Sequence, residues 1–323
     1  MPCGTGIWAL EWGGNSCHAF NCTVEFPSLR SPRSPVTVMP MPVVVTLDGE
    51  FHDFQSPLLY ADDLSAVRGD GIFETLLVRD GQPCLLDAHL QRLTRSADLM
   101  DLPSPDPDAW RGAATSAAAR WASECPDEGV MRWVYSRGRE GGGPPTAFIT
   151  VGVLPERVAA VRRDGLAALT LARAMPSTAS AVPWVLAGAK TLSYAVNMAA
   201  LRYADERGCG DVIFISTDGY VLEGPRSTVV IAADGALLTP PPSLPILHGT
   251  TQQALFGVAT QKGYRCEYRQ LTPADVLEAQ GVWLVSSITL AARVHTLDGR
   301  LLRDTPLAGE LAELVDMAIV SDR

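Results

Sequence analysis

Lysine is almost absent from this sequence of 323 residues. Arginine supplies 24 of the 26 basic side chains, and the two lysines are Lys190 and Lys262. Only lysine offers a primary amine that can lose its proton and act as a nucleophile, because arginine stays protonated. Lys262 lies in the polar segment 260–263, typical of a solvated helix end, whereas Lys190 lies among apolar and small residues at 186–192. The sequence therefore indicates Lys190 as a candidate nucleophile.

Three further absences limit the classes of function. No apolar run approaches the roughly 20 residues of a membrane-spanning helix, and residues 1–40 lack the basic start and apolar run of a secretory signal. The net charge of −10 argues against nucleic-acid and anionic-membrane partners, because both would repel the protein. The seven cysteines show no metal-ligand spacing, so we expect reduced thiols, no metal site and a cytoplasmic location.

The composition changes near residue 40. Residues 1–40 are rich in Gly, Ser, Pro and Cys and lack periodicity, so we expect a disordered extension, or a natural start at Met39 or Met41. From Pro42 onward the signals become regular. They predict an α+β fold with a small domain at 41–155, an inter-domain linker at 156–164 and a larger domain at 165–323.

Hydrophobic periodicity and turn residues place the elements of both domains. The expected strands cover 43–47, 71–78, 83–86, 129–135, 146–153, 166–172, 212–216, 228–232, 236–238 and 282–286. One helix is expected to begin with Asp87 as its N-cap. The other expected helices cover 108–123, 192–207, 250–262, 273–279 and 307–320.

If Lys190 held an aldehyde cofactor as a Schiff base, the chemistry would need four kinds of partner. Three of them are an acid for the ring nitrogen, a hydrogen-bond partner for the ring oxygen and a group that binds the substrate carboxylate. Glu223, just past a turn between two apolar strands, is the candidate acid for a ring nitrogen. Tyr194 follows Lys190 by four residues and would share its helical face, near the ring oxygen. Arg137, with Arg132 as second choice, would bind a substrate carboxylate. Taken singly, Glu223 is better explained as an ordinary turn carboxylate and Tyr194 as a core aromatic, and the arginines fit a mobile basic loop as well as a carboxylate site.

The fourth requirement is a site for the cofactor's phosphate. Thr250 and Thr251 open an expected helix, whose free amides and dipole favour anions. Ser287 at the end of a strand would add a hydroxyl, and Arg92 on the helix begun by Asp87 would add charge. Threonine is also a common helix-start residue and helical arginines are commonly solvated, so none of these signals decides alone.

Taken together, these segments resemble the class IV aminotransferases, the fold-type IV pyridoxal-phosphate enzymes. The resemblance runs in order from about residue 42 to 317 and rests on RGDGIFET at 68–75, HLQRL at 89–93, KTLSY at 190–194, GYVLEG at 219–224, LHGTT at 247–251 and WLVSS at 283–287. It implies an active site between the two domains, pyridoxal 5'-phosphate bound mainly by the larger one, a homodimer and a small amino compound as substrate. By this resemblance Lys190 is the catalytic residue, and the cofactor-binding residues are Arg92, Lys190, Tyr194, Glu223, Thr250, Thr251 and Ser287.

Two segments resemble the aminodeoxychorismate lyases within this family, which eliminate pyruvate from 4-amino-4-deoxychorismate to give 4-aminobenzoate for folate synthesis. They are LAGAK at 186–190 and SRGR at 136–139 before a glycine run. The segment SSITL at 286–290 also favours the lyases, because it lacks the small Thr-Ala-Ala-like pair of the branched-chain enzymes. Glu74 is also typical of transaminases. The alternative is therefore an aminotransferase that acts on branched-chain or D-amino acids with a 2-oxo acid acceptor.

A third hypothesis is a non-catalytic protein that has kept only the fold. The complete set of cofactor-binding residues argues against it. Gln252, Thr228 and His248 depart from the family pattern, which commonly has arginine, asparagine and proline at these positions. These departures lie close to the expected phosphate site, and none of them removes a cofactor contact named above.

Overall fold

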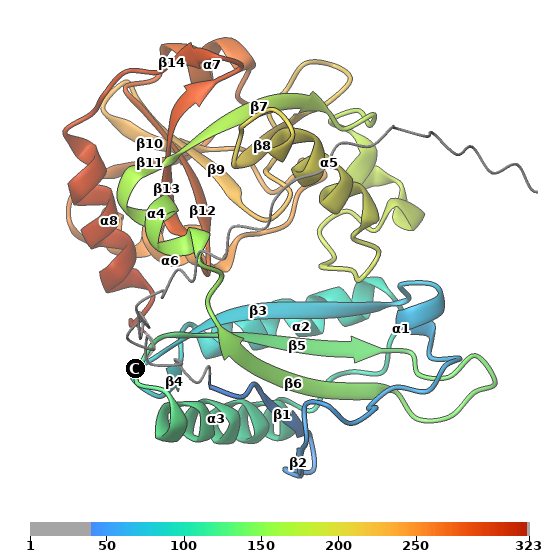
Figure 1. Cartoon of the computed structure of the whole chain (residues 1–323). Helices are drawn as coiled ribbons and strands as arrows, with labels where there is room; N and C mark the ends of the chain where they lie inside the picture. The colour runs from blue at the N-terminus through green and yellow to red at the C-terminus, as the bar shows by residue number, and fades with distance from the viewer. Residues whose placement is uncertain (1–39, 322–323) are drawn as a thin grey trace, which may run out of the picture. The chain divides into compact units, whose positions relative to one another are not determined.

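The computed structural model describes residues 40–321, so the expected extension at 1–40 lies outside the described residues except for Pro40. From Pro40 onward the chain forms one compact unit. This unit contains two β-sheets with helices packed on them (Figure 1). The arrangement confirms the predicted α+β class, and the boundaries proposed for the two domains stay a prediction.

The first sheet is entirely antiparallel. Its strands lie in the order β2 (Phe51–His52), β1 (Val43–Thr46), β6 (Thr146–Val153), β5 (Gly129–Ser136), β3 (Gly71–Arg79) and β4 (Gln82–Pro83). In β3, Ile72, Leu76 and Val78 are fully buried and belong to one core cluster, as expected for a strand with alternating faces. The odd-numbered residues of β3 therefore point to the opposite face.

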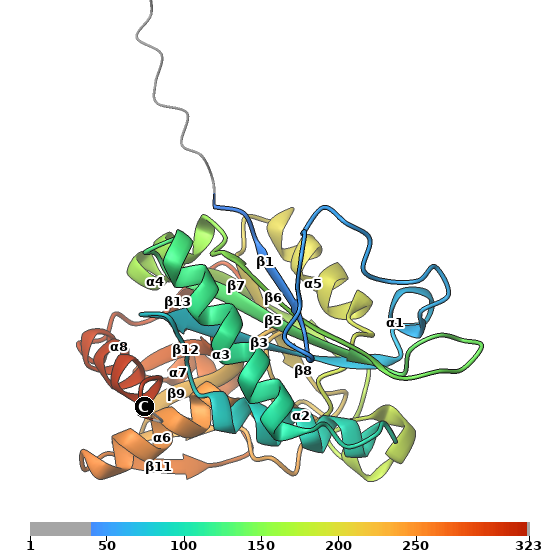
Figure 2. The ribbon, with the colours of Figure 1, turned by 90° about the horizontal axis from the view of Figure 1, so that it is seen from below.

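Two long helices, α2 (Leu86–Leu99) and α3 (Pro107–Glu124), cover one face of this sheet (Figure 2). Leu93 of α2 and Trp110 of α3 pack with Trp133 of β5, and all three are fully buried. The remaining helix of this half, α1 (Leu64–Val67), is a single turn capped by Asp63. Burial of these large side chains provides the main free energy that holds the layer together.

Two expectations for this half were wrong. The expected strand at 83–86 is only Gln82–Pro83, because Leu85 adopts a left-handed backbone conformation (φ 54°) that turns the chain directly into α2. Asp87 is consequently not an N-cap. It lies in the first turn of α2, where a negative charge is favourable, and pairs with Arg111 at 2.6 Å.

The second sheet is mixed. Its strands lie in the order β11 (Arg265–Tyr268), β10 (Ala236–Thr239), β9 (Thr228–Ala233), β12 (Gly281–Ser286), β13 (Leu290–Leu297), β7 (Leu166–Ala172) and β8 (Asp211–Ile215), and β14 (Arg300–Leu301) pairs with β13. The pairs β10–β11, β13–β7 and β7–β8 are parallel. The sequence did not predict β13, because its alanines are depleted in strands and weaken the signal.

Helices complete this half. They are α4 (Arg157–Asp164), the short 3-10 turns η1 (Ala179–Ala181) and η2 (Pro183–Val185), α5 (Ala195–Asp205), α6 (Thr250–Gln261), α7 (Pro273–Glu278) and α8 (Leu307–Ala318). The segment expected as a linker is thus the helix α4, which contacts β13. The helix expected at 192–207 begins only at Ala195 and ends at Asp205.

One buried cluster contains residues from both sheets and thereby fixes the two halves against each other. Leu77 of β3 and Leu85 share this cluster with Leu255 of α6, Trp283 of β12 and Leu314 of α8. Helices α2 and α6 are in contact there. Among residues 40–321, no helix has the length and apolar character needed to span a membrane.

Candidate active site

Lys190 lies on a segment that is tied to both β3 and α2. Its carbonyl oxygen accepts a hydrogen bond from the N–H of Phe73 at 3.0 Å, and its own N–H donates to Ser96 Oγ at 3.1 Å. The next residue, Thr191, forms a β-bridge with Ile72. Because these bonds occupy the backbone, helix α5 starts later than its sequence predicts. The Lys190 side chain therefore projects from a fixed point.

This close approach requires glycine at position 71. A Cβ atom there would lie 2.7 Å from the carbonyl oxygen of Tyr135 and 2.9 Å from Leu192 Cδ1. The carbonyl oxygen of Gly71 also accepts a hydrogen bond from the N–H of Leu192 at 2.8 Å. The glycine at the start of β3 is thus explained by the passage of the Lys190 segment across it.

The Lys190 ammonium group lies over an aromatic face in a setting that favours its neutral form. Its Nζ is 4.4 Å from the centroid of the Phe73 ring. Burial, followed by the positive charge of Arg92, lowers the pKa of Lys190 to about 8, although Glu74 and Glu223 act in the opposite direction. More of the amine is therefore unprotonated near neutral pH than in an ordinary lysine, and this form can act as a nucleophile.

Glu223 is the second predicted residue in this setting. Its backbone carbonyl accepts a hydrogen bond from Phe214 of β8 at 2.8 Å, and its Oε2 accepts one from the N–H of Leu247 at 3.0 Å. Burial raises the pKa of Glu223 to about 7, against the opposing effects of that hydrogen bond and of Lys190. A cationic group beside this carboxyl would favour its ionised form.

A buried network of three charged or polar side chains connects β3 with α2. Glu74, His89 and Arg92 are exposed by 0%, 1% and 5%. Arg92 binds Glu74 through two hydrogen bonds, from Nε to Oε1 at 2.8 Å and from Nη2 to Oε2 at 2.7 Å. His89 Nδ1 lies 2.7 Å from Glu74 Oε2. Burial alone would raise the pKa of Glu74, but Arg92 and His89 hold it well below its usual range.

Two hydroxyl groups lie against the other nitrogen of His89, and a third hydroxyl lies beside one of them. The Nε2 atom of His89 lies 3.3 Å from Thr250 Oγ1 and 3.4 Å from Ser287 Oγ. Thr251 Oγ1 lies 3.4 Å from Ser287 Oγ. The residues come from the start of α6 and the end of β12, two segments that are 36 residues apart in the chain. The structure therefore brings together the predicted phosphate-binding hydroxyls.

The start of α6 adds backbone donors to this hydroxyl group. Gly249 precedes the helix and has no side chain to cap its first amides, so these amides remain available to an anion. A Cβ atom on Gly249 would lie 2.3 Å from Thr228 Oγ1, which explains the glycine. Arg92 Nη1 donates to the carbonyl oxygen of His248 at 3.0 Å. The arginine thereby fixes the segment that leads into α6 and brings positive charge to it.

Tyr194 lies close to Lys190 for a different reason than the sequence suggested. The two residues do not share a helical face, because Tyr194 precedes the first residue of α5. Its ring packs edge-on against Phe73 with the centroids 5.3 Å apart, and its hydroxyl donates to the carbonyl oxygen of Pro225. Burial raises the pKa of Tyr194 to about 12. In this structure the hydroxyl is engaged by the backbone rather than by Lys190.

The two candidate arginines for a substrate carboxylate differ in their surroundings. Arg137 donates to Asp70 Oδ2 at 2.8 Å and to the carbonyl oxygens of Asp101 and Met100 at 3.0 and 2.6 Å. Most N–H groups of its guanidinium are thus bonded to acceptors of the same chain. Arg132 is exposed on β5, and its charge is among those that lower the pKa of Lys190. The charge of Arg132 therefore acts on Lys190.

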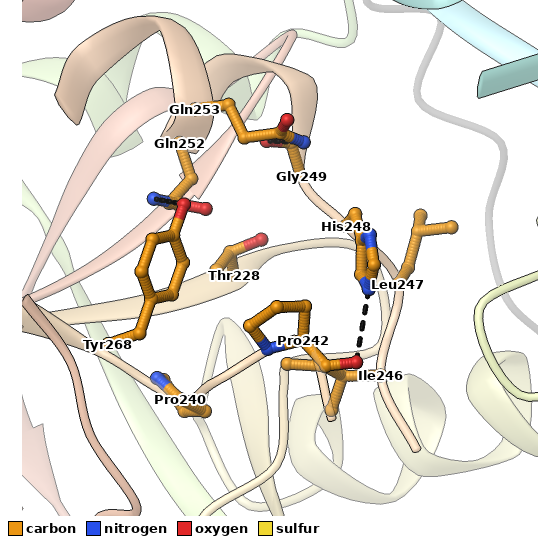
Figure 3. Close-up of a pocket in the computed structure, with 10 residues that line it drawn as sticks. All are labelled: Thr228, Pro240, Pro242, Ile246, Leu247, His248, Gly249, Gln252, Gln253 and Tyr268. Carbon is orange, nitrogen blue, oxygen red and sulfur yellow. Dashed lines mark hydrogen bonds between the residues drawn. The ribbon is translucent and has the colours of Figure 1, made fainter. Parts of the chain in front are cut away.

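A small cavity of about 80 Å³ borders the same loop on the side of β10 and β11 (Figure 3). His248 Nε2 lies 3.2 Å from the carbonyl oxygen of Pro242, and Gln252 Nε2 lies 3.4 Å from Tyr268 Oη. The His248 ring therefore lines this cavity while its carbonyl oxygen faces Arg92. We interpret His248 and Gln252 as structural residues, which hold the loop before α6 on the side that faces β10 and β11.

Sequence reasoning assigned no role to Glu74, His89 or Ser96. A usable signal existed for Glu74, since it occupies a position between Ile72 and Leu76 that alternation assigns to the core. A carboxylate at such a position requires a buried cationic partner. His89 and Arg92 are three residues apart on a helix and thus adjacent on its surface, which makes them the natural partners.

Comparisons with known proteins agree with this geometry. The model of the family "Amino-transferase class IV" matches residues 71–297. A bifunctional aminodeoxychorismate lyase / D-amino acid transaminase from Mycobacterium tuberculosis is 64% identical over 289 residues, which cover 87% of this chain and 100% of the relative.

Two solved structures are also similar. The pyridoxal-phosphate-bound form of a hypothetical aminotransferase from Mycobacterium tuberculosis has 65% identity and a TM-score of 0.86, and the match covers 87% of this chain and 100% of that one. A fold IV transaminase from Curtobacterium pusillum has 38% identity and a TM-score of 0.82, with 87% and 98% covered.

Proposed function

Because the chain belongs to the class IV aminotransferase family, we propose that it is a pyridoxal-phosphate enzyme with two activities at one site. The first is the elimination of pyruvate from 4-amino-4-deoxychorismate, which leaves 4-aminobenzoate for folate synthesis. The second is amino transfer from a D-amino acid to a 2-oxo acid. The observation that carries this proposal is the 64% identity, over the full length of the relative, to a protein named for both activities.

The donor groups on the chain fit the cofactor. A dianionic phosphate matches the hydroxyls of Thr250, Thr251 and Ser287, the first amides of α6 and the charge of Arg92. An aldehyde matches the amine of Lys190, whose pKa burial lowers to about 8. When bound, the cofactor supplies an electron-withdrawing ring that stabilises negative charge developing on the substrate.

Lys190 and Glu223 have the proton-handling roles. We assign Lys190 to cofactor attachment and to proton transfer at Nζ, because an amine with a pKa of about 8 can both accept and release a proton near neutrality. We assign Glu223 to the protonated ring nitrogen, since its buried carboxyl, with a pKa of about 7, gains a favourable charge partner there. Tyr194 would bind the ring oxygen only if its hydroxyl left the carbonyl oxygen of Pro225.

Arg132 is our first candidate for the substrate carboxylate, and Arg137 becomes the second. Arg132 lies opposite Thr75 in the β3–β5 pair and opposite Thr150 in the β5–β6 pair, so these three side chains point to the same face. Phe73, two residues before Thr75, points to that face as well and carries the Lys190 ammonium group over its ring. A carboxylate bound by Arg132 would therefore lie on the Lys190 side of the sheet.

A direct activity assay tests the proposed function. Purified protein supplied with pyridoxal 5'-phosphate is incubated with 4-amino-4-deoxychorismate, and pyruvate and 4-aminobenzoate are measured together. A second reaction with D-alanine and 2-oxoglutarate is analysed for glutamate. We expect equal amounts of both products in the first reaction and glutamate in the second. Glutamate alone would reduce the proposal to a transaminase. Absence of all products, in protein that is not yellow, would support the non-catalytic alternative.

We further propose a homodimer. Support comes from exposed apolar side chains on α5 and in the turn η2, since Val196 is 55% exposed, Met198 45% and Trp184 83%. Light scattering at several protein concentrations tests this, and a mass of one chain, 34.5 kDa, at all concentrations would contradict it.

A cytoplasmic location is proposed from Cys125, Cys209 and Cys266, which are free thiols as in reducing compartments. Cell fractionation tests it.

A further inference from the structure

His89 occupies a position that the roles above do not use. It is 1% exposed, and its ring bridges Glu74 on one side and the hydroxyls of Thr250 and Ser287 on the other. Glu74 is ionised, because the charge and hydrogen bonds of Arg92, together with the hydrogen bond from His89, hold its pKa well below the usual range against the effect of burial. A carboxylate only accepts hydrogen bonds. The 2.7 Å contact therefore places a proton on His89 Nδ1.

The second nitrogen then controls which way the hydroxyl groups point. In a neutral ring with a proton on Nδ1, Nε2 is an acceptor, so a hydroxyl of Thr250 or Ser287 donates toward His89. That hydroxyl offers only lone pairs to an anion. In a doubly protonated ring, Nε2 is a donor to the same oxygen. The hydroxyl hydrogen is then free to point at a phosphate.

We propose that His89 is a positioning residue for the cofactor's phosphate. When the anion binds, His89 gains a proton at Nε2, and the Thr250 and Ser287 hydroxyls thereby turn toward the phosphate. This rests on the proposed cofactor. His89 itself touches hydroxyls and not the anion. Phosphate binding is consequently coupled to the uptake of one proton by a buried side chain.

The charges around His89 make this coupling effective. Burial lowers the pKa of His89, and Arg92 on α2 and Lys190 add to this effect, whereas Glu74 on β3 opposes it. The groups that face the ring from α6 and from the end of β12, Thr250 and Ser287, are uncharged hydroxyls. At neutral pH the ring is therefore uncharged before the anion binds. A dianion nearby raises the pKa of His89, because it stabilises the charged ring.

The sign of the linkage follows from these two states. A group whose pKa rises on binding takes up a proton at pH values between its pKa in the free protein and its pKa in the complex. Affinity for the anion therefore falls as pH rises through the pKa of the complex. The phosphate's own second ionisation has the opposite sign, because the dianion forms as pH rises above about 6. A variant without a titrating side chain at position 89 separates the two effects.

Pyridoxine 5'-phosphate is the probe for this test, because it carries the phosphate and ring but no aldehyde to react with Lys190. Binding to the cofactor-free full-length protein is measured by titration calorimetry in buffers with different ionisation enthalpies, which reports the protons taken up. His89→Gln places a non-titrating amide donor near the position of Nε2. His89→Asn places an amide near Nδ1, facing Glu74, and leaves the hydroxyls without a partner. The two variants are thus a matched pair.

We expect the wild-type protein to take up more protons than His89→Gln, by up to about one per site, at pH values between the free and bound pKa of His89. His89→Gln should bind the probe within about threefold of wild type, whereas His89→Asn should bind about tenfold more weakly, as expected for the loss of one hydrogen bond near a charged ligand. Equal proton uptake in wild type and His89→Gln would overturn the inference.

Nuclear magnetic resonance gives an independent measurement if the variants fold poorly. The wild-type chain contains five histidines, so ring ¹⁵N signals can be followed individually. One buried ring should change from neutral, with its proton on Nδ1, to doubly protonated on addition of the probe. A ring that stays neutral while the probe binds would refute the role of His89 alone. Failure of the wild-type protein to bind the probe would instead refute the proposed cofactor.

Discussion

The two ends of the candidate site are built in contrasting ways. At the phosphate end, Glu74, His89 and Arg92 are at most 5% exposed, and each is bonded to another member of the network. At the substrate end, Arg132 is exposed, and the Arg137–Asp70 pair has side chains that are 40% and 31% exposed. The same kinds of side chain therefore work in an almost dry setting at one end and in a wet one at the other.

This difference in burial determines what each end can change. A buried charge that loses its partner destabilises the protein strongly, so the phosphate end is fixed by the fold itself. An exposed ion pair contributes little to stability, so arginines at the substrate end can be exchanged at small cost. In the proposed assignment, the cofactor-binding residues are therefore tied to the fold, whereas the residues assigned to the substrate lie on the more exposed β5 and its loop.

Replacement of Lys190, which stands between the two ends, should have the largest effect. We expect Lys190→Ala to lower turnover on the order of 10⁴-fold or more and to remove the visible absorbance of the bound cofactor, because no other amine can replace it. The matched control is Lys262→Ala, since Lys262 is exposed and is the only other lysine of the chain. Both properties should survive in the control. Retention of either one in Lys190→Ala would contradict its role.

A matched pair of substitutions tests the contrast in stability. Glu74→Gln removes the charge opposite buried Arg92 and should lower the free energy of unfolding by about 3–5 kcal/mol. Asp70→Asn removes the charge opposite half-exposed Arg137 and should cost no more than about 1 kcal/mol. Chemical denaturation of the cofactor-free proteins measures both. Similar losses in the two variants would show that burial does not distinguish the two ends.

The pH dependence of stability should follow the same network. The pKa of Glu74 in the folded protein lies below its ordinary value, so its contribution is present above the unfolded pKa of about 4.3 and is lost as pH falls through the folded pKa. Glu74→Gln should therefore lose stability less steeply on acidification than the wild type. Unfolding curves between pH 6 and pH 3 measure this difference.

The sequence predicted the phosphate end better than the mechanism that holds it. The hydroxyls of Thr250, Thr251 and Ser287 lie together and Arg92 bonds the loop before α6, because a helix start, a strand end and a motif on α2 are local patterns. Their role in binding phosphate stays a prediction. The pairing of Arg92 with Glu74 was not predicted, because it depends on which face of β3 meets α2. Residues that meet only through such tertiary contacts have no characteristic separation along the sequence.

The substrate end shows the opposite limit. The sequence favoured Arg137 over Arg132 because of its glycine-rich neighbourhood, yet Arg137 is bonded to Asp70, which lies 67 residues away in the chain. Lys190 was correctly placed in an apolar setting, but the backbone bonds to Phe73 and Ser96 replace the helix that spacing predicted. Burial was readable from the sequence, whereas the partner of an exposed arginine was not.

Glu223 extends the comparison to the ring of the cofactor. Glu223→Gln should lower turnover about 10²-fold, because an amide can still accept the Leu247 N–H but cannot hold a proton on the ring nitrogen. The pKa of Glu223 is raised to about 7, so in the cofactor-free protein its buried carboxyl lowers the free energy of unfolding as pH rises from about 4.3 to that value. Denaturation curves at pH 5 and pH 8 should show this loss in the wild type and not in Glu223→Gln.

The smallest expected effect separates the two arginines of the substrate end. Arg132→Ala should raise the KM for 4-amino-4-deoxychorismate about tenfold and leave affinity for pyridoxal 5'-phosphate unchanged, because it removes one charge-assisted contact on the Lys190 face of the sheet. Arg137→Ala should change the KM by no more than about threefold, since its bonds run to Asp70 and to two backbone carbonyls. Steady-state kinetics and cofactor titration of both variants measure this. The reverse order of KM values would return the carboxylate to Arg137, and it would mean that the bond to Asp70 opens when substrate binds.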